Sequence, residues 1–199
     1  MDALKEYVHA IVPTEDNDVI YGSYTVEDIY NSPEDDRIEL IYGKLYNMGA
    51  PSAKHQFILG HCYRKIADHI DENNGDCRPV MAPFAVKLFD DEKTLVEPDI
   101  SVICDPDKID DKGCNGAPDW IIEIVSPGNP GHDFVMKFHL YRKAGVREYW
   151  IIDPRNETVF VYYFEKNLMQ NYTFDTPVYS NIYSGLAIEL SQFKERLNI

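Results

Sequence analysis

The sequence has no apolar run of the roughly 18 residues that a membrane-spanning helix needs, and no internal repeat, low-complexity tract or Gly/Ser-rich linker. Its first residues, MDALKEYVHAIVPTEDND, lack the basic, apolar and small-residue order of a secretory signal peptide. We therefore expect a cytoplasmic protein with no membrane association. With 199 residues and 44% hydrophobic content, the chain can fill one sizeable core. We expect one domain over residues 1–199, with residues 1–22 as an irregular arm.

Cysteine is scarce, and no two cysteines have the C-x-x-C spacing of a zinc site. Nothing else in the sequence indicates a secreted chain that would need disulfide bonds. Free cysteine behaves as a small hydrophobic residue and is often buried. The expectation is reduced, mostly buried thiols at all four positions, which are Cys62, Cys77, Cys104 and Cys114.

Basic residues are also few, with 19 Lys and Arg against 34 Asp and Glu, for a net charge of −15. Proteins that bind nucleic acids usually carry a basic surface, because much of their affinity comes from neutralising phosphates. The composition alone therefore argues against a DNA partner. Distribution matters more than the total, however. Basic residues dominate between Gly131 and Arg147, so a local basic face is compatible with an acidic protein.

The hydrophobic pattern predicts a mixed α/β (α+β) fold. Helices are expected from Thr25, from Ser52 to about Glu72, and from Gly131 to Ala144, where Gly145 ends the last one. A hairpin is expected around Gly43, and further strands or hairpins at residues 80–89, 94–104, 120–125, 148–153, 158–164 and 167–174. Because the 131–144 helix connects two strands, it should join parallel neighbours in the sheet.

Two acidic residues, Asp99 and Glu123, lie inside strand-like apolar runs. Glu123 has apolar neighbours on both sides, so both faces of its strand should be covered. Burying a carboxylate in such a place costs free energy unless it is paired or binds a metal. Glu123 therefore needs a cationic partner. A Mg²⁺ ion shared with Asp99 would serve, and so would an ion pair with Lys or Arg that has no catalytic role; spacing alone does not decide between them.

The expected helix after Glu123 adds three polar residues on one face. Asp133, Lys137 and Tyr141 are spaced i, i+4 and i+8. From this face the Lys137 ammonium could reach back to the strand end, orient an attacking water and stabilise developing negative charge. The alternative is a surface pair of Lys137 with Asp133, which contributes only a few tenths of a kcal/mol.

Four segments of the sequence resemble the Uma-type restriction endonucleases, a branch of the PD-(D/E)XK nuclease superfamily. They are Glu97-Pro-Asp99, Gly116-Ala-Pro-Asp-Trp-Ile-Ile-Glu123-Ile-Val-Ser-Pro127, Asp133-x-x-x-Lys137-x-x-x-Tyr141 and Gly145-Val-Arg-Glu-Tyr-Trp-Ile-Ile-Asp153-Pro. The similarity is dense from about Val96 to Pro154. It continues more weakly upstream, through residues 37–46 and Ser52-x-x-His55.

The resemblance implies a restriction-endonuclease-like mixed sheet flanked by helices, with the active site at one edge. It implies a Mg²⁺- or Mn²⁺-dependent endodeoxyribonuclease that hydrolyses DNA phosphodiester bonds. Asp99, Glu123 and the backbone carbonyl of Ile124 would hold the metal. Glu39 matches an acidic residue that the family carries near its N-terminus, and as a catalytic residue it would complete the metal site through water.

The sequence departs from the superfamily pattern at one catalytic position. The third residue of the (D/E)XK element is Val125 rather than lysine. Lys137, from the next helix, is the candidate replacement. If its ammonium does not reach the site, metal binding alone would survive.

Three more residues are candidates for auxiliary roles: Asp133, Tyr141 and His55. His55 could bind phosphate or relay a proton, but no spacing ties it to the carboxylates, and this favours a histidine packed on the face of its helix. A homodimer would suit cutting of both DNA strands. Two alternatives stay open. One is a catalytically silent nucleic-acid-binding or assembly module that retains the fold, and the other is hydrolysis of a smaller phosphodiester.

Overall fold

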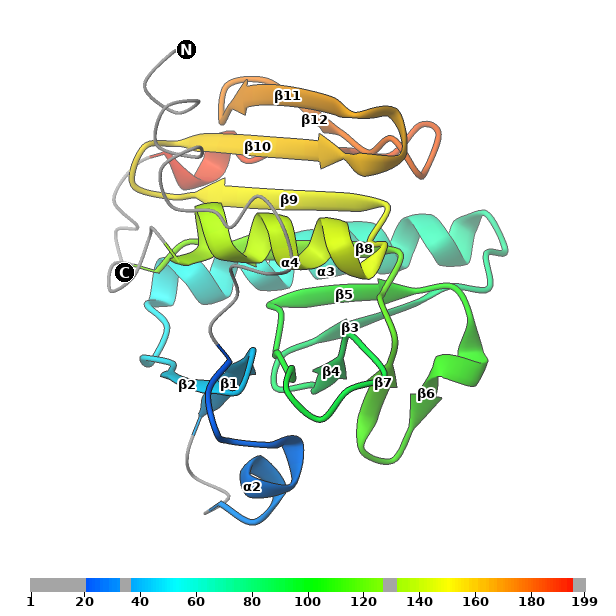
Figure 1. Cartoon of the computed structure of the whole chain (residues 1–199). Coiled ribbons are helices and arrows are strands. Elements are labelled where there is room, and N and C mark those ends of the chain that lie inside the picture. Colours follow the sequence, from blue (N-terminus) through cyan, green and yellow to red (C-terminus); the bar gives the residue numbers. More distant parts are fainter. Residues whose placement is uncertain (1–20, 33–36, 127–131, 195–199) are drawn as a thin grey trace.

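The structure, a computed structural model, describes residues 21–32, 37–126 and 132–194, and only the backbone at 132–134. The arm expected at residues 1–22 therefore lies almost wholly outside the described residues. A six-stranded sheet forms the centre, in the order β11-β10-β9-β8-β5-β3 (Figure 1). Only β8 and β9 are parallel; the other neighbours are antiparallel. The strands are β3 (Arg78–Met81), β5 (Ile100–Ile103), β8 (Trp120–Ile124), β9 (Glu148–Asp153), β10 (Thr158–Tyr163) and β11 (Leu168–Thr173).

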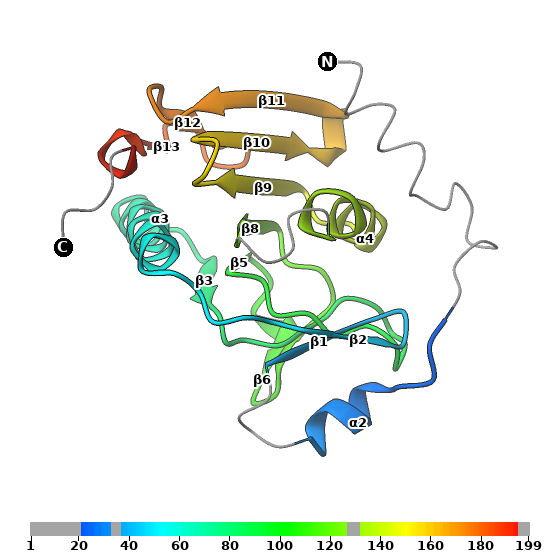
Figure 2. The same ribbon diagram turned by 90° about the vertical axis from the view of Figure 1, so that its left-hand side faces the viewer.

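Helices cover both faces of the middle of this sheet (Figure 2). Helix α3 (Ala53–Glu72) packs on one face against a cluster that includes Ile122 and Trp150. Helix α4 (Phe138–Ala144) packs on the other face, where Ile121 and Tyr149 lie. Every residue of β8 and β9 is buried, which explains their nearly continuous apolar sequences. The predicted mixed sheet flanked by helices is confirmed.

The long helix begins where the sequence predicts. Ser52 is the N-cap of α3, and its Oγ accepts a hydrogen bond of 3.2 Å from the backbone N–H of His55. The buried residues Ile58, Cys62 and Ile66 recur at helical spacing on the face that meets the sheet. Helix α3 therefore brings His55, in its first turn, to the sheet.

The crossover between β8 and β9 is the second element that positions the site. It contains a π-helical segment (η3, His132–Lys137) followed by α4. Gly145 ends α4 at φ 91°, a left-handed conformation that suits glycine. The expected end of this helix and the parallel pairing of β8 with β9 are confirmed. The π-helical form was not predicted, and the expected first residue, Gly131, lies outside the described residues.

The N-terminal part forms a small unit beside the sheet. Thr25 caps the short helix α2 (Val26–Tyr30) in a capping box with Asp28. The hairpin of β1 (Ile38–Ile41) and β2 (Lys44–Asn47) turns at Gly43, as expected. Leu40 exchanges two backbone hydrogen bonds of 2.8 Å with Leu95. This pairing fixes β1 against the chain just before Asp99.

Two predicted strands are shorter than the sequence suggested. The 80–89 run divides into β3 and β4 (Val86–Lys87), which belong to different sheets, because Pro83 has no N–H with which to continue a ladder. Pro98 similarly limits the 94–104 run to β5. Strand β4 pairs with β7 (Gly113–Asn115), which pairs with β6 (Ile109–Asp110). The remaining short elements are β12 (Val178–Tyr179), β13 (Ala187–Ile188), η2 (Pro106–Lys108), η4 (Phe164–Lys166) and η5 (Ser191–Phe193).

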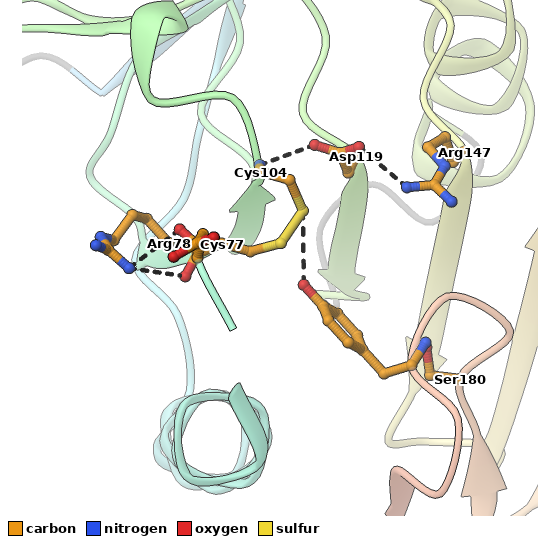
Figure 3. The surroundings of a disulfide bond; sticks show 8 residues. Cys77, Arg78, Cys104, Asp119, Arg147 and Ser180 are labelled. Atoms are coloured by element: carbon orange, nitrogen blue, oxygen red, sulfur yellow. Dashed lines mark hydrogen bonds and ion pairs between the residues drawn. A yellow bond between two sulfur atoms is a disulfide. The ribbon is translucent and has the colours of Figure 1, made fainter. Parts of the chain in front are cut away.

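The prediction of four reduced thiols was wrong for two of them. Cys77 and Cys104 form a disulfide bond (Figure 3). They face each other because Arg78 pairs with Ile103 across β3 and β5, which makes these cysteines the next opposed pair. Sequence spacing could not reveal this pairing, since it depends on strand register. Cys62 and Cys114 are free and buried; burial raises the pKa of Cys62 to about 12.

Within the part of the chain that the structure describes, no helix is both long enough and apolar enough to cross a membrane.

Candidate active site

Five separate elements bring the predicted site residues together. Glu39 lies in β1, Asp99 just before β5, Glu123 in β8, and Lys137 where η3 meets α4, while His55 lies in the first turn of α3. Four of these side chains are buried, those of Glu39, His55, Glu123 and Lys137. Buried ionisable groups must have partners, so the contacts among them define the site.

Lys137 is the centre of this cluster. Its Nζ donates hydrogen bonds to Glu123 Oε1 at 2.8 Å and to Glu39 Oε1 at 2.9 Å. The residue is 3% exposed, so it is not the surface lysine of the alternative interpretation. Glu123 thus has the cationic partner that its burial required. The side chain of Asp133 lies outside the described residues, and its auxiliary role stays a prediction.

Tyr141 holds the same carboxylate oxygen. Its hydroxyl donates a hydrogen bond of 2.6 Å to Glu123 Oε1, and the ring packs edge-on against Tyr149 at 4.9 Å between centroids. The tyrosine is fully buried. Lys137 and Tyr141 therefore reach Glu123 from one face of the helix, as their i, i+4 spacing predicted.

Asp99 connects β5 with β8 and α3. Its Oδ2 accepts a hydrogen bond of 2.7 Å from the backbone N–H of Ile124 and lies 3.1 Å from His55 Nε2. His55 therefore lies at the site. Sequence spacing favours a histidine that only packs on the face of its own helix, and the contact with Asp99 shows that this interpretation is wrong. The contact joins residues 44 positions apart, so it depends on how α3 lies on the sheet.

The motif-lysine position is filled by an apolar residue: Val125 packs against the cluster beneath α4. The Lys137 ammonium, from the crossover, contacts Glu123, and its role as the replacement for the motif lysine stays a prediction. Ile124 is placed at the site by its amide, which binds Asp99. The role of its carbonyl as a metal ligand stays a prediction.

Glu97 also lies at the site, although the sequence analysis gave it no role beyond its place in the Glu97-Pro-Asp99 segment. Its backbone N–H donates to Glu39 Oε1 at 3.0 Å, and its own Oε2 is buried with no hydrogen-bond partner among the described residues. The nearest described cation, Arg37, is 3.9 Å away. Burial raises the pKa of Glu97, and Arg37 opposes that rise. Its position two residues before Asp99 was the available signal, because alternate residues of an extended chain share a side.

Negative charge exceeds positive charge at the site. The carboxylates of Glu39, Glu97 and Glu123 face the cations of Lys137 and Arg37, and Asp99 adds a fourth carboxylate beside His55. Oxygen donors with excess negative charge are the chemistry that hard divalent ions prefer. Among the described residues, however, no three Asp, Glu, His or Cys side chains already converge as a ligand set.

The basic run between residues 131 and 147 divides between the site and the surface, where Arg142 and Lys143 are exposed. Lys137 lies inside the site, and Arg147 contacts Asp119 at 3.3 Å and Glu165 at 2.9 Å. Arg142 donates to the side chain of Asn167 at 2.8 Å. At least two of its four cations are therefore neutralised within the protein.

Three comparisons relate this geometry to known proteins. The profile of the Uma2 family, described as "Putative restriction endonuclease", matches residues 25–191. A crystal structure from Anabaena variabilis ATCC 29413, described as a putative nuclease belonging to DUF820, has a TM-score of 0.71 and 25% sequence identity, and the match covers 86% of this chain and 98% of that one. An uncharacterized protein of Synechocystis sp., slr1290, is 25% identical over 126 residues, or 63% of this chain and 65% of that protein.

The matched range includes every site residue named above, from Arg37 to Tyr141. The similar crystal structure has the same overall fold over most of both chains. The chain therefore belongs to the Uma2 family of restriction-endonuclease-like proteins.

Proposed function

We propose that this protein is a metal-dependent endodeoxyribonuclease that hydrolyses DNA phosphodiester bonds with Mg²⁺ or Mn²⁺. The observation that carries the proposal is the buried Lys137, which contacts Glu39 and Glu123 while Asp99 lies just before the neighbouring strand β5. Membership of a family described as restriction endonucleases supports this reaction class.

The donor set fits a hard divalent ion. Asp99 and Glu123, with the Ile124 carbonyl, would hold it, and Asp99 Oδ1 accepts no hydrogen bond from the described residues. Mg²⁺ commonly takes only one or two carboxylates and completes its shell with water and substrate phosphate, which agrees with the absence of three converging side chains in the described part. When bound, the ion would lower the pKa of a water ligand and neutralise phosphoryl charge.

The protein groups around that position have separable tasks. Lys137 is held by Glu39 and Glu123 with its ammonium in contact with both carboxylates, where it can orient the attacking water and stabilise developing negative charge. Tyr141 fixes Glu123 through its hydroxyl. Glu39 acts by holding Lys137, and by accepting the Glu97 amide it also fixes the segment that carries Asp99.

A second candidate is a catalytically silent module that binds nucleic acid or assembles with a partner. The observation in its favour is that Lys137 pairs with Glu123 in a buried setting, which is the buried ion pair of the alternative interpretation. The net charge of −15 also favours it. A smaller phosphodiester substrate would meet less repulsion than DNA, and belongs among the substrates to be tested.

Plasmid nicking in Mn²⁺ tests the proposal with four proteins: wild type, Glu123→Gln, Lys137→Met and the control Lys65→Met, whose lysine is exposed on α3. We expect the two site variants to lose about 100-fold or more in rate, the control to cleave like wild type, and EDTA to stop all cleavage. Equal nicking by all four proteins would indicate a contaminant and refute the proposal. Salt-sensitive DNA binding with no cleavage would favour the silent module.

A further inference from the structure

We propose that His55 is a positioning residue that fixes the Asp99 carboxylate, so that Asp99 Oδ1 is presented to the metal. The inference deepens the proposed function and rests on it. It is carried by a contact between α3 and the start of β5, where His55 Nε2 lies 3.1 Å from Asp99 Oδ2.

The backbone of His55 is itself held by the helix cap. Ser52 Oγ caps the backbone N–H of His55 at 3.2 Å, which sets the first turn of α3. The His55 side chain is 8% exposed and that of Asp99 is 15% exposed. A side chain so enclosed has few alternative rotamers, and so the imidazole is directed at Asp99 by the fold.

The contact also fixes where the imidazole carries its hydrogen. An ionised carboxylate only accepts hydrogen bonds, so a neutral His55 must carry its hydrogen on Nε2 to make this bond. The other nitrogen, Nδ1, is buried and has no hydrogen-bond partner among the described residues. No described protein group would accept a hydrogen bond from an Nδ1–H, so nothing in the described structure stabilises that tautomer. The Nε2–H tautomer is therefore favoured.

Two donors then converge on one oxygen of Asp99. The Ile124 N–H comes from β8 at 2.7 Å and the His55 Nε2–H from α3. With Oδ2 occupied from two sides, the plane of the carboxylate is defined. Oδ1 is the oxygen that receives no hydrogen bond from the described residues, and it is the atom left to bind a cation.

Removal of His55 should leave Asp99 with one donor and let its carboxylate rotate. Groups that orient a metal ligand typically change metal affinity by about 10- to 100-fold when they are mutated. The expected loss is therefore partial, whereas loss of Asp99 itself should remove the site.

The first test needs neither metal nor activity. Nitrogen-15 NMR of the metal-free protein, at a pH where His55 is neutral, should show this imidazole as the Nε2–H tautomer. The same spectrum of Asp99→Ala should show a shift toward the tautomer mixture of a free imidazole. A His55 that carries its hydrogen on Nδ1, or that is unaffected by Asp99→Ala, would overturn the proposal.

The second test measures Mn²⁺ affinity by calorimetry in wild type, His55→Ala, His55→Gln and the control His69→Ala, in the last turn of the same helix, where the half-buried imidazole contacts Tyr183. We expect about a 10-fold weaker Kd for His55→Ala, partial recovery with the glutamine N–H donor, and no change in the control. Unfolding curves show which variants are folded. Wild-type affinity in a folded His55→Ala would overturn the inference. If wild type binds no Mn²⁺, the metal proposal fails and the NMR result alone decides the positioning.

Discussion

At the scale of single residues, the site depends on a lysine that serves two carboxylates. Lys137 contacts Glu39 and Glu123 at 2.9 and 2.8 Å in a buried setting. Removing one member of a buried ion pair leaves an uncompensated charge and costs about 3–5 kcal/mol. Removing both members together costs less than the sum, because no orphan charge is left between them.

A double-mutant cycle on Lys137 and Glu39 tests this coupling. Lys137→Met should lower the free energy of unfolding by about 3 kcal/mol or more, and Lys137→Met with Glu39→Gln should be at least about 1 kcal/mol more stable than additivity predicts. Urea unfolding of the four proteins measures it. Additive effects would mean that the two groups are not paired in solution.

Glu148 is a buried carboxylate outside the site, and its hydrogen bonds are structural. Its Oε1 accepts the Trp150 indole N–H at 2.6 Å, and its Oε2 accepts the backbone N–H groups of Asn181 and Ile182 at 2.8 and 2.9 Å. Burial raises the pKa of Glu148, and these hydrogen bonds oppose the rise. The residue thus joins the start of β9 to the C-terminal loop.

The pH dependence of stability should report the raised pKa of Glu148. A raised native pKa means that the folded state keeps the proton at pH values where the unfolded carboxyl has lost it, so the contribution to stability falls as pH rises through that interval. Glu148→Gln should cost about 1–3 kcal/mol, because its amide faces donors. The stability difference from wild type, measured by urea unfolding from pH 4 to pH 7, should shrink as pH rises. A difference that grows with pH would contradict the direction of the shift.

At the scale of elements, the sequence predicts those features that depend on residues close together in the chain, such as helix ends and turns. Ser52 and Gly145 mark helix ends through capping and positive φ, and Gly43 marks a hairpin turn. Glu123 was identifiable because a charge in an apolar strand needs a partner, and Lys137 and Tyr141 because helical spacing puts them on one face. These inferences use residues that are close in the chain.

Contacts between distant elements could not be predicted in the same way. The His55–Asp99 contact depends on the placement of α3, and the Cys77–Cys104 pair on the register of β3 with β5. The π-helical segment before α4 has no local signature that we recognise. For Glu39, only the family resemblance indicated a role; the contact with Lys137 follows from how β1 docks beside the sheet.

The first turn of α3 offers a test at this scale. Ser52→Ala should remove the cap on His55 N–H and lower the free energy of unfolding by about 1 kcal/mol. Ser52→Asp, which keeps a capping oxygen, should remain near wild type. Thermal or urea unfolding measures both. If Ser52→Ala is as stable as wild type, Ser52 does not hold the helix start.

At the scale of the whole molecule, the topology gathers residues from widely spaced segments. The order β9-β8-β5-β3 places the strand of Glu123 beside the strand that follows Asp99. The parallel crossover returns Lys137 to Glu123, and α3 approaches from the opposite face (Figure 2). A site built from five elements forms only when the sheet has formed, so its integrity should follow global stability.

The disulfide bond is a global constraint because it closes a loop that contains Asp99. Its sequence separation of 27 residues corresponds to about 3.5 kcal/mol of stabilisation in the chain-entropy account. Reductant should therefore lower the urea midpoint of wild type, whereas Cys77→Ser with Cys104→Ser should start lower and not respond. Cys62→Ser keeps the bond and should respond like wild type. No effect of reductant on wild type would show that the bond does not form in solution.

The central claim is that Asp99 and Glu123 are metal ligands, so that Glu123 does more than balance Lys137. A crystal structure of the protein soaked in Mn²⁺, with anomalous data, tests it most directly. The account predicts an anomalous peak within bonding distance of carboxylate oxygens from both residues, next to the Ile124 backbone. A well-ordered site without that peak, with Lys137 still joining Glu39 and Glu123, would contradict it.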